Sequence, residues 1–237
     1  MMMAALGNNT VHGQFESDVI KTSMGDLTMT FIGHGTLMFT LNELVIHIDP
    51  VSREADYSQL PDADLVLVTH QHGDHLDMDA IHQVQKAGTK LVMTQACLDQ
   101  LEDVEASVMR NGDRMTFRGV EVEAVPAYNV EHVRPDGTPF HPKGEGNGYV
   151  LTMGDTRVLV AGDTENIPEI KALKEIDVAF LPMNLPYTMD PEMVADAALA
   201  MRPRILYPYH FGNTDTQQLV NLLEGAGDIE VRVRELQ

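Results

Sequence analysis

The stretch of this sequence that most constrains its fold covers residues 69–75, where three histidines and one aspartate fall within six positions. It directly follows an apolar run, Leu-Val-Leu-Val, that is typical of a buried β-strand. Backbone alternation can direct the imidazoles of His70 and His72 to one side. Asp74 and His75 come one turn later and can face a second point nearby. This His-x-His-x-Asp-His pattern suits zinc, manganese or iron, so it predicts a metal site where a strand opens into a loop.

Other polar residues also stand at the ends of apolar runs that we interpret as strands. Asp49 follows one such run, Asp163 follows a second, and His210 follows a third. His141 lies in a long loop rich in glycine and proline, over residues 126–147, just before another strand. Each position alone is a weak signal. Together with the dense cluster they indicate one shared site.

The order of elements predicts the architecture. Each half of the chain gives a series of β-hairpins followed by alternating strands and helices, which is typical of an α/β sandwich of two sheets with helices on its outer faces. We expect residues 1–26 to form an N-terminal arm and residues 27–237 to form a single domain. The expected helices are Met78–Ala87, Gln95–Leu101, Pro168–Lys174, Pro191–Met201 with Asp190 as N-cap, and Thr214–Leu223.

Composition limits the classes of partner that this chain is expected to bind. The 237 residues include 36 acidic and 16 basic side chains, a net charge of −20, which disfavours nucleic acid and anionic membranes. No apolar run approaches membrane-spanning length, and the single cysteine, Cys97, cannot form an intrachain disulfide. We therefore expect a small-molecule substrate, with no nucleic-acid or membrane partner. Homo-oligomerisation stays open, and a cytoplasmic location is favoured over a periplasmic one that a trimmed leader would imply.

These motifs together resemble the metallo-β-lactamase superfamily. Residues 70–75 match its His-x-His-x-Asp-His motif, Gly162-Asp163-Thr164 resembles its bridging-carboxylate motif, and His210 resembles its last histidine ligand. The segments Ile-Gly-His-Gly, Ile-Asp-Pro, Ala-Gly-Asp-Thr and Tyr-Pro-Tyr-His resemble the branch that includes L-ascorbate-6-phosphate lactonase and uncharacterised metal-dependent hydrolases. The resemblance spans residues 27–212. It implies the metallo-β-lactamase fold, an αββα sandwich of two mixed sheets, with the site at one edge between them.

The resemblance also implies two metal ions per chain, expected to be zinc, with manganese and iron as alternatives. His141 is the expected third histidine of the first metal site, and His132, in the same loop, is its alternative. The implied ligand set is His70, His72 and His141 for the first metal, Asp74, His75 and His210 for the second, and Asp163 as the bridge.

Asp74 is the expected catalytic residue. Two divalent ions would lower the pKa of a bridging water so that hydroxide is available near neutral pH, and Asp74 would orient that water or accept its proton. We interpret Asp49 as an acceptor that fixes the tautomer of a ligand histidine, or as a plain turn residue before proline. His34 is either a substrate contact or a turn histidine. Asn184 and Tyr187 either shape the substrate pocket or are ordinary loop residues.

The leading hypothesis for function is a metal-dependent hydrolase that acts on a small ester, lactone, amide or phosphoester. An iron-dependent oxidoreductase and a non-catalytic metal-binding protein on the same fold are the alternatives. The oxidoreductase branch usually has a glutamate in the cluster, which this sequence lacks. Because every expected ligand type is retained, the sequence does not indicate a degenerate site. Iron content and hydrolysis of generic substrates would discriminate among the three.

Overall fold

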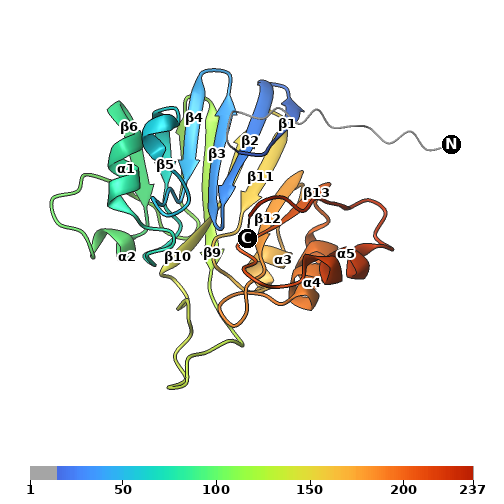
Figure 1. Ribbon diagram of the computed structural model, residues 1–237. Coiled ribbons are helices and arrows are strands. Elements are labelled where there is room, and N and C mark those ends of the chain that lie inside the picture. The colour runs from blue at the N-terminus through green and yellow to red at the C-terminus, as the bar shows by residue number, and fades with distance from the viewer. Residues whose placement is uncertain (1–14, 237) are drawn as a thin grey trace.

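A computed structural model describes residues 15–236, which form two mixed seven-stranded sheets packed face to face (Figure 1). Helices α1 and α2 lie outside the first sheet, and α3, α4 and α5 lie outside the second, so the predicted αββα sandwich is confirmed. The first half contains β1 (Ser17–Thr22), β2 (Gly25–Gly33), β3 (Thr36–Leu41), β4 (Leu44–Ile48), the 3-10 turn η1 (Tyr57–Gln59), β5 (Ala63–Leu67), α1 (Met78–Val84), β6 (Gln85–Met93), α2 (Gln95–Leu98) and β7 (Ser107–Val108). The second half contains β8 (Arg114–Phe117), β9 (Val120–Ala127), β10 (Gly146–Met153), β11 (Thr156–Val160), α3 (Pro168–Lys171), β12 (Val178–Pro182), α4 (Pro191–Met201), β13 (Ile205–Tyr209), α5 (Thr216–Leu223) and β14 (Glu230–Val231).

The two halves share one topology. In the first sheet β1 to β4 pair antiparallel and β4 to β7 pair parallel. In the second sheet β8 to β11 pair antiparallel and β11 to β14 pair parallel. Consequently β2, β4 and β5 end at the same edge of the first sheet, and β9, β11, β12 and β13 end at the same edge of the second. Residues that follow these strands therefore gather in one region.

Strand β5 shows why the sequences of the strands that lead to this region are unbroken apolar runs. Leu65 and Leu67 belong to the core between the two sheets. Val66, on the opposite face, belongs to a second core layer together with Ile81 and Val84 of α1. A strand buried on both faces needs apolar side chains at every position, and all five residues of β5 are buried.

Aromatic side chains fill the centre of the core between the sheets. The rings of Phe180 and Tyr207 stack with their centroids 4.8 Å apart. Phe31, from the first sheet, contacts both of them, and Phe39 packs on Phe180. All four are essentially unexposed. This packing holds the two sheets in fixed register, which positions the residues at their common edge.

The predicted arm over residues 1–26 is wrong for its second part. Residues 17–22 form strand β1, which pairs antiparallel with β2 along its whole length. Asp18 on this strand is buried and forms ion pairs with Arg232 and Arg234 near the other end of the chain. A partner more than 200 residues away stabilises a strand whose own sequence is too polar to reveal it. Residues 1–14 lie outside the described residues.

Several predicted helices are shorter than expected. Helix α1 ends at Val84 rather than Ala87, because Gln85 takes an extended backbone and pairs with Ala63 in β6. Helices α2 and α3 span one turn each, and α5 begins at Thr216 with Asp215 as its cap. Helix α4 has the predicted bounds and the Asp190 cap. In residues 15–236 no helix combines the length and apolar character needed to cross a membrane.

Candidate metal centre

The strand-end cluster, residues 69–75, begins two residues after the end of β5 and is held by Asp49, which follows the neighbouring strand β4. Asp49, the first residue after β4, accepts hydrogen bonds from the backbone N–H and the hydroxyl of Thr69 at 2.7 and 2.6 Å. Asp49 Oδ2 also lies 2.7 Å from His75 Nδ1. All three side chains are fully buried. If the anionic carboxylate accepts from Nδ1–H, the Nε2 of His75 is left free to face the site, as a metal ligand requires.

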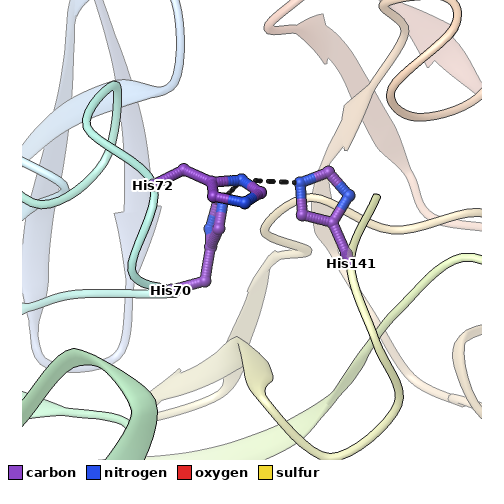
Figure 2. A group of neighbouring side chains, drawn as sticks. All are labelled: His70, His72 and His141. Atoms are coloured by element: carbon purple, nitrogen blue, oxygen red, sulfur yellow. Dashed lines mark hydrogen bonds between the residues drawn. The ribbon is translucent and has the colours of Figure 1, made fainter. Parts of the chain in front are cut away.

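Three imidazoles, which come from two segments of the chain, converge at one point of the site (Figure 2). His70 and His72 come from the strand-end cluster, and His141 comes from the site loop, residues 128–145, which joins β9 to β10. His72 Nδ1 lies 3.1 Å from His70 Nε2 and 3.2 Å from His141 Nε2. Burial, together with the neighbouring histidines, lowers the pKa of His70 well below its usual value and also lowers that of His72. Neutral imidazole is the form that binds metal ions.

A second group of donors lies opposite the first. His34 Nε2 and His210 Nε2 each lie 3.5 Å from Asp74 Oδ2, and the two rings are 3.8 Å apart. His34 follows β2, and His210 follows β13, so this group is shared between the two sheets. Within each of these two groups all candidate ligand atoms lie within 4.8 Å of one another.

Asp163, which follows β11, contacts members of both groups. Its Oδ2 lies 3.2 Å from His141 Nε2 and 3.4 Å from His210 Nε2. Its Oδ1 lies 3.4 Å from His75 Nε2. Burial raises the pKa of Asp163, but His210, His75 and His141 outweigh burial and hold it well below its usual range. The carboxylate is therefore charged, and it lies where a bridging ligand would sit.

The pKa of His75 is shifted in the direction opposite to that of Asp163. Burial lowers its pKa, but the carboxylates of Asp163 and Asp49 outweigh burial and raise the pKa to about 9. Two buried carboxylates around one imidazole therefore favour positive charge at this point. A bound divalent cation supplies such charge without a proton.

Several buried polar atoms of the site have no hydrogen-bond partner among residues 15–236. They are His75 Nε2, Asp163 Oδ1 and both ring nitrogens of His210. Buried groups left in this state cost free energy unless a ligand satisfies them. Imidazole nitrogens and carboxylate oxygens aimed at common points are the donors that zinc, manganese and iron take. The residues present therefore fit a metal centre.

The local backbone is adapted to this crowding. His34, Asp49 and His210 all adopt left-handed conformations, with φ of 47°, 46° and 49°. Non-glycine residues rarely take this conformation, and they cluster at sites that the surrounding structure over-determines. Gly35 has no side chain for a related reason, because a Cβ there would lie 2.7 Å from the Cε1 of His75.

Comparisons with known proteins agree with this geometry. The sequence profile of the Beta-lactamase superfamily domain matches residues 28–210. A UPF0173 metal-dependent hydrolase from Enterococcus faecalis is 34% identical over 194 residues, which cover 77% of this chain and 86% of the relative. The chain belongs to the UPF0173 metal-dependent hydrolase family of the metallo-β-lactamase superfamily.

Two further relatives extend over nearly the whole chain. A UPF0173 metal-dependent hydrolase from Methanopyrus kandleri is 31% identical over 227 residues, which cover 88% of this chain and 97% of the relative. The crystal structure of a protein assigned as a metal-dependent hydrolase, from Parabacteroides distasonis, is 48% identical, with a TM-score of 0.88 over 94% of this chain and 100% of that chain. The expected superfamily is therefore confirmed.

The structure separates the two histidines proposed as alternatives in this UPF0173 chain. His141 lies with His70 and His72, as expected for the third histidine. His132 lies in the same loop, but its Nδ1 is 2.9 Å from Glu165 Oε1. The structure therefore brings His141 to the other histidines, and His132 forms part of the support of the site loop.

The remaining predicted residues lie around the mouth of the site. A cavity of about 250 Å³ opens above the donor groups. Asn184 and Tyr187, from the loop after β12, line it together with Asp74 and two residues that the sequence did not single out, Arg134 and Phe140. His34 was expected to be a substrate contact or a turn residue. The structure places it within the second donor group.

Glu165 is a supporting residue that sequence reasoning missed. Its buried carboxylate accepts hydrogen bonds from the backbone N–H groups of Val130, Glu131 and His132, each at 2.7 Å, and from the Asn129 amide at 2.9 Å. Burial raises the pKa of Glu165, but these hydrogen bonds outweigh burial and lower it. The sequence feature that could have indicated Glu165 is its position two residues after Asp163.

Asn129 connects Glu165 to His141, a candidate metal ligand. Its Oδ1 lies 2.8 Å from the backbone nitrogen of His141 and 2.7 Å from His141 Nδ1. Because Asn129 donates its amide N–H to Glu165, its oxygen is the atom that faces His141. His141 therefore carries its proton on Nδ1 and turns Nε2 toward the site.

Proposed function

We propose that this UPF0173 chain is a metal-dependent hydrolase with a binuclear centre that cleaves a small ester, lactone, amide or phosphoester. The observation that carries the proposal is the position of Asp163, whose carboxylate lies within 3.4 Å of His141, His210 and His75. A single carboxylate between two donor groups is the arrangement that two metal ions share. The family's name supports the reaction class.

The first metal would be held by the group around His72, and the second by the group around Asp74, with Asp163 between them. His75 and His210, whose rings stack 5.1 Å apart, would both direct Nε2 toward the bridging position. When bound, two divalent ions supply an acidic water and polarise a substrate carbonyl or phosphoryl oxygen. We propose zinc, with manganese and iron as alternatives, because the same donors suit all three.

Asp74 would handle the proton in this reaction. Its side chain is 33% exposed and lines the cavity, whereas Asp163 is 2% exposed. Burial raises the pKa of Asp74, but the imidazoles of His210 and His34, each with Nε2 3.5 Å from Asp74 Oδ2, outweigh burial and lower it, so the carboxylate is charged. A charged carboxylate at the cavity can accept the proton of the attacking water and return it to the leaving group as the scissile bond breaks. His34 and His210 hold Asp74 in place for this step.

The metal content of protein purified without chelator tests the proposal. We expect about two metal ions per chain in the wild type and in the His132→Ala variant, and a clear loss in His141→Ala. The same preparations should hydrolyse generic lactone and phosphodiester substrates. A lactone is the first choice because of the sequence resemblance to the ascorbate-6-phosphate lactonase branch.

Three outcomes would change the proposal. Two irons per chain would favour the oxidoreductase alternative. Absence of metal after growth with an adequate supply would mean that the cluster is not a working site. A loss of metal in His132→Ala, with none in His141→Ala, would reverse the assignment of the third histidine.

A further inference from the structure

The site loop places a cation at the mouth of the cavity. Within this loop residues 133–139 form a short hairpin, in which Val133 pairs with Pro139 and the Arg134 N–H donates to the carbonyl of Thr138 at 2.7 Å. Arg134, at the base of this hairpin, lines the same cavity as Asp74 and Asp163. The hairpin therefore fixes the backbone of Arg134 beside the candidate metal centre.

The side chain of Arg134 is held by an aromatic ring rather than by an acid. Its guanidinium carbon lies 5.0 Å from the centre of the Phe140 ring, which in turn packs edge-on against Tyr187 at 5.1 Å. A guanidinium that rests on a ring keeps its N–H groups directed sideways, in its own plane. One nitrogen of the guanidinium donates to the Phe140 carbonyl at 3.5 Å, and the remaining donors can still form a fork with a carboxylate or a phosphate.

Arg134 lacks the partner that most arginines of this chain have. Eight of the ten arginines form an ion pair with Asp or Glu within the described residues, but Arg134 does not. The nearby carboxylate of Asp136 accepts hydrogen bonds from the backbone N–H and the hydroxyl of Thr138, at 3.0 and 2.7 Å. In a protein with 36 acidic side chains, an arginine without an acid partner beside a cavity is unusual.

The net charge of the chain makes a cation at the position of Arg134 important for the recognition of anions. The chain carries a net charge of −20, so its surface as a whole repels small anions. Arg134 is the one Lys or Arg among the described residues that line the cavity. We propose that Arg134 forms a subsite for an anionic group of the substrate, a carboxylate or a phosphate placed away from the scissile bond. This inference rests on the proposed hydrolase function and narrows its substrates to small anionic esters or lactones.

A matched pair of esters tests this inference. 4-Nitrophenyl butyrate and mono-4-nitrophenyl succinate release the same leaving group and differ only in that the succinate ester has a carboxylate where the butyrate ester has a methyl group. Arg134→Gln should lower kcat/KM for the succinate ester about tenfold or more and leave the butyrate ester within about twofold. Arg114→Gln, on β8 and outside the cavity lining, removes the same charge and should leave both values unchanged. An unaltered ratio in Arg134→Gln would overturn the subsite.

Calorimetric binding of phenylacetate and of benzylphosphonate separates this inference from the hydrolase proposal. Arg134→Gln should raise the Kd of at least one anion about tenfold, and Arg114→Gln should raise neither. The anion that is affected identifies the preferred group. If neither ester is hydrolysed but the Kd changes, the subsite holds and the hydrolase proposal fails. If both esters are hydrolysed and neither the ratio nor the Kd changes, the subsite fails alone.

Discussion

In the strand-end cluster the first histidine comes three residues after the end of β5, and the buried carboxylate of Asp49 ties the backbone of Thr69 and the ring of His75 to the neighbouring strand. In the site loop His141 is held differently. It lies 14 residues after Ala127, the last residue of β9, and belongs to no helix or strand. Two side chains, Asn129 and Glu165, connect it to the second sheet.

The strand-end cluster and the site loop differ in how closely each is tied to the core of the fold. Loss of support in the strand-end cluster disturbs β4 and β5, which belong to the core. Loss of support in the site loop disturbs a segment of irregular structure and leaves both sheets paired. We therefore expect changes behind the strand-end cluster to alter both stability and metal binding, and changes behind the site loop to alter metal binding alone.

The largest effect is expected for Asp49→Ala. This change leaves the Thr69 N–H, the Thr69 hydroxyl and His75 Nδ1 without their acceptor in a fully buried position. The free energy of unfolding should fall by about 3 kcal/mol, and metal affinity should fall by about 100-fold. Urea denaturation and competition with a chelator measure the two quantities.

Asp49→Asn is the matched control, because it keeps one acceptor oxygen and removes the charge. It should lie between the wild type and Asp49→Ala in both measurements. Wild-type stability in Asp49→Ala would show that the strand-end cluster does not depend on this carboxylate.

This contrast also explains which parts of the molecule could be predicted from the sequence. Strands such as β5 are buried on both faces, so their composition reveals them, and candidate ligands that follow such strands are found with them. The cluster at residues 70–75 could be predicted because its members are contiguous. The choice between His141 and His132 could not, because it depends on how Glu165 and Asn129 fold the site loop.

Long-range partners account for the other differences. Strand β1 could not be predicted because the buried Asp18 depends on Arg232 and Arg234, which lie more than 200 residues away. The place of His34 in the second donor group depends on the close approach of His210 from the other sheet. Arg134 was missed because an arginine in a polar loop has no local pattern that separates a cavity residue from a solvated one.

A pH titration of stability tests the first of these two regions further through His47, which is buried on β4, the strand that Asp49 follows. Burial lowers the pKa of His47 from 6.5 to about 4. Because the unfolded chain binds this proton more readily, the stabilising effect of neutral His47 is present above pH 6.5 and is lost as the pH falls toward 4. Between pH 7.5 and 5.0 the loss should be about 2 kcal/mol.

The matched variant for this titration is His47→Gln, which retains an N–H donor for the Pro61 carbonyl that His47 Nε2 contacts at 3.0 Å. Urea denaturation of both proteins at the two pH values isolates the contribution of His47. The wild type should lose about 2 kcal/mol more than the variant. Equal losses in the two proteins would contradict the role assigned to His47.

The smallest effect is expected for Glu165→Gln, which disturbs only the site loop. A glutamine keeps one acceptor oxygen but directs an NH₂ group either toward the backbone N–H groups of Val130 and Glu131 or toward that of His132, so the loop loses part of its support. Metal affinity should fall about tenfold at one of the two sites, while the free energy of unfolding changes by less than about 1 kcal/mol. His132→Asn, which removes only the imidazole contact with Glu165, should stay within about twofold of the wild type in metal affinity. If Glu165→Gln instead lowered stability as much as Asp49→Ala, the site loop would be part of the cooperative core, and the distinction between the two ways of holding a ligand would fail.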